Sequence, residues 1–338
     1  MNVNDKHLEP TQSFVYEIKE DSAVILRCFS RDTKVEIPEQ IEGYPVTEVG
    51  PYAFSAHMDE AAFYPGIKNG RTKLYIPETA CLADAPALTG KILQEIVFPA
   101  SVKKIGKYCF YNCANLEKIT FGGELRDWGA GAFTGVHHVK ELTVTADAQG
   151  KTSLKQVLDE LHEEISVIYF DEQGREAHLV FPEYFEEGVE NTPARILEEK
   201  IHGSGMMYRN CIKERRMDFR QYDTLFEHAG FLESGRMTMQ LALGRLWYPI
   251  ELSDKARQQY EAYTASYMET AADLILEKRD LSGLEWLLNL VDQYGQKKES
   301  LMAYLMEQAS KQQFLEAISF LMNLGRENKR PKRRRFEL

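Results

Sequence analysis

The sequence of 338 residues contains no long apolar run. Its longest mostly apolar stretches, 165–170 and 284–290, are far shorter than the roughly 18 residues that predict a membrane-spanning helix. The first ten residues, MNVNDKHLEP, lack the apolar centre of a secretory signal peptide. We therefore expect a cytoplasmic protein without a transmembrane segment.

Cysteine is scarce. The five cysteines are an odd number, and no two have the C-x-x-C spacing of a zinc site. Cys109 and Cys113 flank the apolar Phe110, and we expect them to be reduced thiols of the core, with a redox pair as the alternative.

Catalytic and cofactor signatures are also missing. The eight histidines form no H-E-x-x-H motif, and His137-His138 has no evident third metal ligand. No G-x-S-x-G nucleophile elbow is present. Gly150-Lys151-Thr152 imitates a phosphate-binding loop, but Thr145 stands where the first glycine belongs. We predict that the protein is not an enzyme and has no cofactor or metal.

What the sequence does contain is a 23-residue repeat. Apolar triplets with the spacing L-x-x-I-x-F recur as Leu93, Ile96 and Phe98, then Leu116, Ile119 and Phe121, then Val139, Leu142 and Val144. This spacing within a period of 20–29 residues is typical of leucine-rich repeats. Two buried columns are expected beside it, formed by Val49, Ile105 and Trp128 and by Phe54, Phe110 and Phe133.

Two segments resemble the BspA-like class of bacterial leucine-rich repeats. Residues 37–54 read IPEQIEGYPVTEVGPYAF and residues 102–116 read VKKIGKYCFYNCANL, against a class pattern of I-P…G-x-P-V-T-x-I-G…A-F-x-x-C-x-x-L. The resemblance covers about residues 14–146 and implies a β-solenoid. Segment 74–77 begins a unit that departs from the pattern, after an apparent insertion at 56–71. Members of the class are often cell-surface binders, which the lack of an export signal opposes.

The predicted fold class is α+β, with an N-terminal leucine-rich repeat β-solenoid followed by a mostly α-helical domain of helical hairpins. We expect an N-terminal β-hairpin cap at 1–34 and the solenoid at 35–146. A linking helix, a β-hairpin and an irregular loop follow at 147–218. The helical domain occupies 219–325, and a basic disordered tail occupies 326–338.

The helical domain repeats weakly. At an offset of 31 residues, Leu274 aligns with Leu305 and Leu284 with Leu315. Paired helices with a period near 33 have the length of ankyrin or tetratricopeptide units. We predict an ankyrin-like array of helical hairpins that lacks the usual ankyrin motifs.

The outward side chains of the repeat strands form the candidate interaction face. Strand alternation places three groups of aligned residues there: Gln94, Glu95 and Val97, then Glu117, Lys118 and Thr120, then Lys140, Glu141 and Thr143. Repeat proteins bind extended partners on such surfaces. The face is short, mixed in charge and poor in aromatic residues, so an ordinary solvated surface is the alternative.

Segment 181–210 is a second candidate site because long connections inside compact proteins are often functional or disordered. Its notable side chains are Glu183, Tyr184, Arg195, His202, Tyr208 and Arg209. The alternative is a wedge between the two domains.

The charge is uneven. The net charge is −11, yet residues 326–338 contain seven basic and two acidic residues. The candidate polyanion-binding residues are Lys329, Arg330, Lys332, Arg333, Arg334 and Arg335. They fit nucleic acid phosphates or an anionic membrane, or they form a solvated end.

The sequence therefore predicts a non-enzymatic cytoplasmic scaffold that binds an unidentified protein through the leucine-rich repeat surface and the helical domain. Nucleic-acid association through the tail is the alternative. An enzyme with a site at 181–210 is a more distant one.

Overall fold

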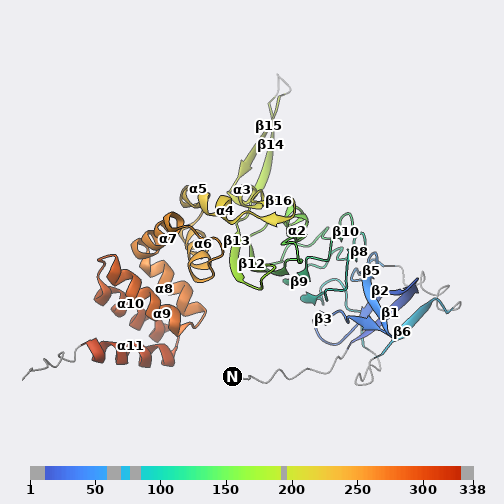
Figure 1. The fold of residues 1–338 in the computed structure, drawn as a ribbon, viewed down its shortest axis with the longest axis horizontal. Helices are drawn as coiled ribbons and strands as arrows, with labels where there is room; N and C mark the ends of the chain where they lie inside the picture. The colour runs from blue at the N-terminus through green and yellow to red at the C-terminus, as the bar shows by residue number, and fades with distance from the viewer. Residues whose placement is uncertain (1–11, 59–69, 77–84, 192–195, 329–338) are drawn as a thin grey trace, which may run out of the picture. The chain divides into compact units, whose positions relative to one another are not determined.

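The computed structural model describes residues 12–58, 70–76, 85–191 and 196–328. The chain divides into two compact units, residues 1–225 and 226–338. The first is a β-solenoid with a β-rich extension, and the second is helical (Figure 1). The predicted fold class is confirmed. The helical unit begins at Phe226 rather than at the predicted Phe219, because the short helix at 219–224 belongs to the first unit.

One sheet of the solenoid carries the repeat strands. Five strands run parallel and a sixth, β13, closes the sheet in antiparallel orientation. In order across the sheet they are β3 (Lys34–Glu36), β7 (Glu95–Val97), β9 (Lys118–Gly122), β11 (Glu141–Thr145), β12 (Ile165–Phe170) and β13 (Glu176–Phe181).

The second sheet joins the other side of each coil to an N-terminal hairpin. Its order is β10 (Asp127–Trp128), β8 (Lys104–Ile105), β5 (Tyr44–Val49), β2 (Ser22–Phe29), β1 (Ser13–Lys19) and β6 (Thr72–Tyr75), with β4 (Gln40–Ile41) paired to β5. The repeat unit that was predicted to begin at 74–77 is therefore not found in the described residues 72–75. Residues 72–75 pair antiparallel with β1 at the edge of this sheet.

Between the sheets lie the two predicted columns, which the structure confirms. Val49, Ile105 and Trp128 align in register, and the rings of Phe54, Phe110 and Phe133 stack at centroid distances of 5.6 Å and 5.6 Å. The repeated I-G pair has a steric reason. A side chain at Gly106 would collide with the backbone of Pro51 in the preceding coil.

Single side chains close both ends of the repeat-strand sheet. At the β3 edge, the Gln12 amide donates to Lys34 O at 2.9 Å and accepts from Glu36 N at 3.0 Å. At the β13 edge, the Tyr222 hydroxyl accepts from Val180 N at 2.9 Å and donates to Val180 O at 2.7 Å. Open edges promote strand pairing between molecules, so these bonds reduce that hazard.

The irregular loop that was predicted as the last part of segment 147–218 is replaced by regular structure. An antiparallel two-stranded arm, β14 (Phe185–Asn191) and β15 (Ile196–His202), projects from the body of the first unit (Figure 1). The helix α2 (Leu154–Glu160) precedes the arm in the chain. After the arm come α3 (Gly205–Arg209), the short hairpin of β16 (Ile212–Lys213) and β17 (Arg216–Met217), and then α4 (Phe219–Thr224). The arm strands are rich in glutamate, which is depleted in strands generally, so their composition indicated a loop.

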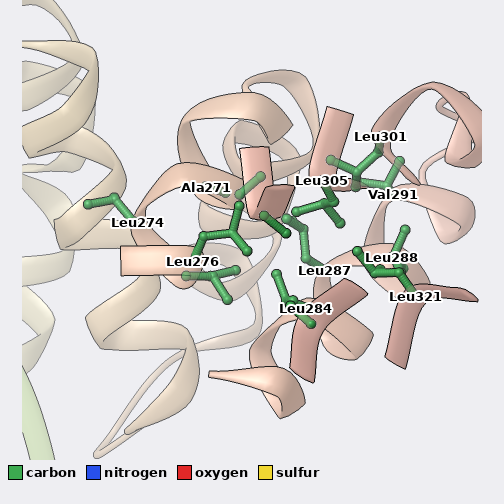
Figure 2. Close-up of a cluster of buried hydrophobic side chains, with 14 of the residues drawn as sticks. Ala271, Leu274, Leu276, Leu284, Leu287, Leu288, Val291, Leu301, Leu305 and Leu321 are labelled. Atoms are coloured by element: carbon green, nitrogen blue, oxygen red, sulfur yellow. The ribbon is translucent and has the colours of Figure 1, made fainter. Parts of the chain in front are cut away.

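The second unit is a stack of helical hairpins. Its helices are α5 (Phe226–Leu232), α6 (Gly235–Trp247), α7 (Asp254–Ser266), α8 (Met268–Glu277), α9 (Leu281–Gln293), α10 (Lys298–Lys311) and α11 (Leu315–Asn328). Leucines of α8, α9, α10 and α11 form its core (Figure 2). Tyrosine–carboxylate bonds tie successive hairpins together, from Tyr304 to Asp273 at 2.9 Å and from Tyr294 to Glu261 at 3.1 Å.

The predicted 31-residue alignment of these hairpins is wrong by about one helical turn. It equates Leu284, which is fully buried, with Leu315, which is 69% exposed. The turns that end α8 and α10 provide the correct register. Arg279 and Gln313 both have φ of 53° and lie 34 residues apart. That spacing equals a tetratricopeptide period and exceeds the ankyrin period by one residue.

Candidate functional site

The nine residues of the predicted interaction face lie on or just before adjacent parallel strands. Glu95 is paired with Lys118 and Lys118 with Glu141. Two positions further along, Val97, Thr120 and Thr143 are paired in the same way. The residue that follows each of Glu95, Lys118 and Glu141 on its own strand, such as Ile119, is buried. The solenoid therefore brings the predicted residues together as straight rows on its outer surface.

The charged residues of this face neutralise one another. Lys118 Nζ lies 3.2 Å from Glu141 Oε1, and Lys140 Nζ lies 3.0 Å from Glu117 Oε1. Glu95 Oε1 lies 3.1 Å from Lys34 Nζ of the preceding strand. Gln94 Oε1 accepts a hydrogen bond from the Thr33 hydroxyl at 3.0 Å. The rows thus have alternating charge and attract neither polyanions nor polycations strongly.

The uncharged row forms a narrow strip. Val97, Thr120 and Thr143 continue into Ile168 of β12, and all four are half-buried. All four lie on strands that are paired with a neighbouring strand on both sides. A β-branched strip beside a charged row has the anatomy of a small protein interface, with an apolar centre and a polar rim.

Arg209, the central residue of the second predicted site, is buried and fixed in place. Its five N–H groups meet five backbone carbonyl oxygens, those of Leu158, Leu161, Glu163, Pro182 and Gly205, at 2.6–3.1 Å. Burial lowers its pKa to about 10, so the guanidinium stays charged at neutral pH. Arg209 therefore joins segment 158–163 at the end of α2, the start of α3 and Pro182, and has no donor left for a ligand.

The other residues of that predicted site do not form one cluster. The guanidinium carbon of Arg209 lies 4.9 Å from the Tyr184 ring centroid, and Tyr208 is buried. Glu183 is exposed. His202 stacks on Phe185 at the base of the arm and lies 3.0 Å from the Glu187 carboxylate. Arg195 lies outside the described residues. The site residues remain a prediction, with Tyr184 and Arg209 adjacent and His202 on the arm.

The phosphate-loop lookalike at 150–152 is part of a repeated Asp-centred turn. The Asp147 carboxylate accepts from Gln149 N and Lys151 N, both at 2.9 Å. Asp171 accepts in the same way from Gln173 N at 2.9 Å and Arg175 N at 2.8 Å. Burial acts to raise the pKa of Asp171, but these hydrogen bonds and that from the Arg175 side chain outweigh it, and the pKa lies below its ordinary value. The turn amides are thus occupied by aspartate.

The cysteines that the structure describes, Cys28, Cys109, Cys113 and Cys211, are all buried free thiols. Burial raises the pKa of Cys113 to about 12 and that of Cys211 to about 12, so both are protonated at neutral pH. They are poor nucleophiles in this state.

Two classes of site have no counterpart in the parts of the chain that the structure describes. No group of three or more His, Cys, Asp or Glu side chains is placed there to hold a metal ion. None of the described helices is long and apolar enough to cross a membrane. The six basic tail residues, Lys329 to Arg335, lie outside the described residues, so the polyanion hypothesis stays a prediction.

Sequence reasoning missed an aromatic group on the turns of the solenoid. Tyr52, Tyr108 and Tyr111 lie next to the core position of the A-F motif and are half-buried, with their rings in mutual contact. A signal was present, because Tyr52 and Tyr108 occupy equivalent positions two residues after the I-G glycine.

Comparison with known proteins agrees with the repeat architecture. A family model described as "BspA type Leucine rich repeat region (6 copies)" matches residues 83–156. No curated protein matches the chain. A solved leucine rich cell surface protein from Faecalibacterium prausnitzii A2-165 is 15% identical over 45% of this chain, with a TM-score of 0.21. The chain spans 32% of that structure, and so low a TM-score supports no argument.

Proposed function

We propose that the protein is a non-enzymatic cytoplasmic scaffold that binds a protein partner through the strand face of its solenoid, because residues 83–156 match the model of BspA-type leucine-rich repeats. Repeats of this family suggest protein–protein interaction or surface adhesion. The helical unit, built of stacked hairpins, is a second binding surface in this proposal.

The observation that supports the proposal best is the strip Val97–Thr120–Thr143–Ile168. Its members come from four different coils, yet backbone register aligns them. The strip needs little ordering when a partner binds, because it stands on paired strands. A rigid surface loses less entropy on binding than a loop would.

The charged row beside the strip fits a role in orientation rather than in affinity. Its ion pairs, such as Lys118–Glu141, are half-exposed to exposed, and such pairs contribute about 0–1 kcal/mol. Discrimination among partners then comes from matching the alternating signs, since a mismatched like charge costs binding energy.

Affinity capture with a matched set of baits tests this function. The disrupting bait carries Thr120→Lys and Thr143→Lys, which place two long cations on the strip. The control bait carries Asp21→Lys in the exposed turn between β1 and β2, outside both proposed surfaces, and changes the net charge by the same amount. We expect a discrete protein from nuclease-treated cytosolic extract to be retained at high salt by wild type and control, and lost by the double variant.

A bait that ends at Gly325 separates the nucleic-acid alternative. Retention of the partner by this bait supports the solenoid as the contact. Nucleic acid that is held only by the full chain and lost at high salt would contradict the proposal and favour the tail.

A further inference from the structure

The turns of the solenoid carry a second surface that does not depend on the strand face. It lies on the turns that follow β5 and β8, at Tyr52, His57, Lys107, Tyr108, Tyr111 and Asn112. We call these six residues the tyrosine band. The three tyrosines are half-buried, and His57, Lys107 and Asn112 are exposed.

Two of these tyrosines, Tyr52 and Tyr108, adopt a left-handed backbone conformation that is unfavourable for residues other than glycine. Tyr52 N donates to Lys107 O, and Tyr108 N donates to Ala130 O, so Tyr52, Tyr108 and Gly131 occupy equivalent places in three coils. All three have positive φ, at 56°, 53° and 65°. This left-handed region costs residues other than glycine roughly 1–2 kcal/mol. Only the third coil has the glycine that the conformation favours.

The rings are held in one connected row. Tyr52 stacks on Tyr108 at a centroid distance of 5.3 Å, and Tyr111 lies edge to face with Tyr108 at 5.9 Å. His57 meets Tyr111 at 5.2 Å. Gly131 makes room for the row, because a Cβ there would lie 2.5 Å from the Tyr108 ring. The aromatic surface is therefore preformed and rigid, as residues that dominate interface energies tend to be.

The six residues of the band include a lysine and no acid, whereas the chain as a whole has a net charge of −11. The turn segments 50–57, 106–113 and 129–136 contain no aspartate or glutamate, although the chain has 52 acidic residues. Lys107 adds a positive charge, while the Asn112 amide lies 3.2 Å from the His57 ring. Glu160 reaches the third coil, where it accepts a hydrogen bond from Phe133 N. The acid-free region is thus centred on the first two coils.

The phenol hydroxyls and the Lys107 ammonium offer hydrogen-bond donors on turns whose described segments, 50–57 and 106–113, contain no carboxylate. We propose that the tyrosine band is a docking site for an acidic, extended polypeptide segment. Carboxylates of the segment accept from these donors, and its apolar side chains pack on the ring edges. Charge complementarity favours this partner, because Lys107 attracts an acidic segment whereas the net negative charge of the chain repels it elsewhere.

The proposal is tested with a displayed library of random twelve-residue peptides, selected on the purified full-length protein. We expect the enriched peptides to carry an excess of aspartate and glutamate. A fluorescein-labelled synthetic copy of the most enriched peptide is then titrated by fluorescence anisotropy against wild type and variants.

Two variants replace a band tyrosine by the residue at the equivalent position of the third coil, so the backbone of the second coil should be preserved. Tyr108→Gly supplies the residue found at Gly131, and Tyr111→Thr supplies the residue found at Thr134. We expect each to weaken the peptide at least tenfold and Lys107→Gln to weaken it about threefold. Circular dichroism verifies that each variant is folded.

The strand-face variant Thr120→Lys serves as the matched control and should bind the peptide as wild type does. Failure of the library to enrich any peptide, enrichment without an acidic excess, or unchanged binding by folded Tyr108→Gly would overturn the proposal. None of these results bears on capture through the strand face, so the two proposals fail separately.

Discussion

Replacement of Arg209 should destabilise the first unit far more than any exposed arginine would. Its five N–H groups satisfy five backbone carbonyls from three segments of chain, at 2.6–3.1 Å. Arg209→Met removes the donors while keeping much of the apolar volume. The buried carbonyls then lose their partners, and each orphaned group costs about 1–3 kcal/mol before relaxation or entry of water.

The magnitude follows from these contacts. Such costs are not additive, so we expect a loss of about 4 kcal/mol in the free energy of unfolding for Arg209→Met. For a domain of 150–250 residues this lowers Tm by about 8–16 °C. Arg209→Lys keeps the charge but offers three donors in place of five, and we expect about half that loss.

Tryptophan fluorescence isolates the relevant transition. Trp128 belongs to the first unit and the other two tryptophans to the second, so a background with Trp247→Phe and Trp286→Phe reports on the first unit alone. Arg220→Met, at an exposed position of α4, is the control and should shift Tm little. If Arg209→Met unfolds within about 1 kcal/mol of its parent in urea, the role assigned to the five carbonyl contacts is wrong.

Three further predictions rest on single contacts. Folding lowers the pKa of Asp171, so this carboxylate stabilises the folded protein above the pKa that it has in the unfolded chain, and the stabilisation is lost as pH falls through the folded pKa. Asp171→Asn should therefore reduce the decrease in Tm that acid causes below about pH 4. A Tm profile in acid that is the same as that of wild type would refute this. Gly106→Ala should lower the free energy of unfolding by about 3 kcal/mol or more, because the new methyl group collides with the Pro51 backbone. The control Gly122→Ala, which has open space around the new methyl group, should lower it by less than about 1 kcal/mol. Equal melting temperatures of the two variants would contradict the packing described for Gly106. Gln12→Ala exposes the β3 edge and should produce concentration-dependent dimers in light scattering, while a strictly monomeric variant would show that the edge needs no cover.

The solenoid could be predicted from sequence because every coil must bury the same positions against its neighbours. The triplets from Leu93 to Val144 and the phenylalanine column repeat for that reason, and each was placed correctly. The nine face residues followed by alternation. The ion pairs that neutralise the face were not predicted, because alignment of positions in neighbouring coils does not determine which long charged side chains meet.

The failures arose where local composition and tertiary structure disagree. The arm at 185–202 is rich in glutamate, and its strand pairing is not evident from composition. Arg209 was predicted as a site residue, because its neighbours in the sequence do not reveal that carbonyl oxygens of segment 158–163 and of Pro182 converge on it. The helical offset was misjudged by matching leucines, although Leu315 is exposed and the left-handed residues Arg279 and Gln313 mark the true register.

Site-specific photo-crosslinking in native cytosol tests the central claim, that the strand face binds a protein, most directly. A photoreactive phenylalanine analogue replaces Thr120 in one protein and Asp21, in the exposed turn between β1 and β2, in another. The account predicts a discrete protein adduct from position 120 that is absent from position 21 and is abolished by Thr143→Lys. No adduct at position 120, or the same adducts at both positions, would contradict it.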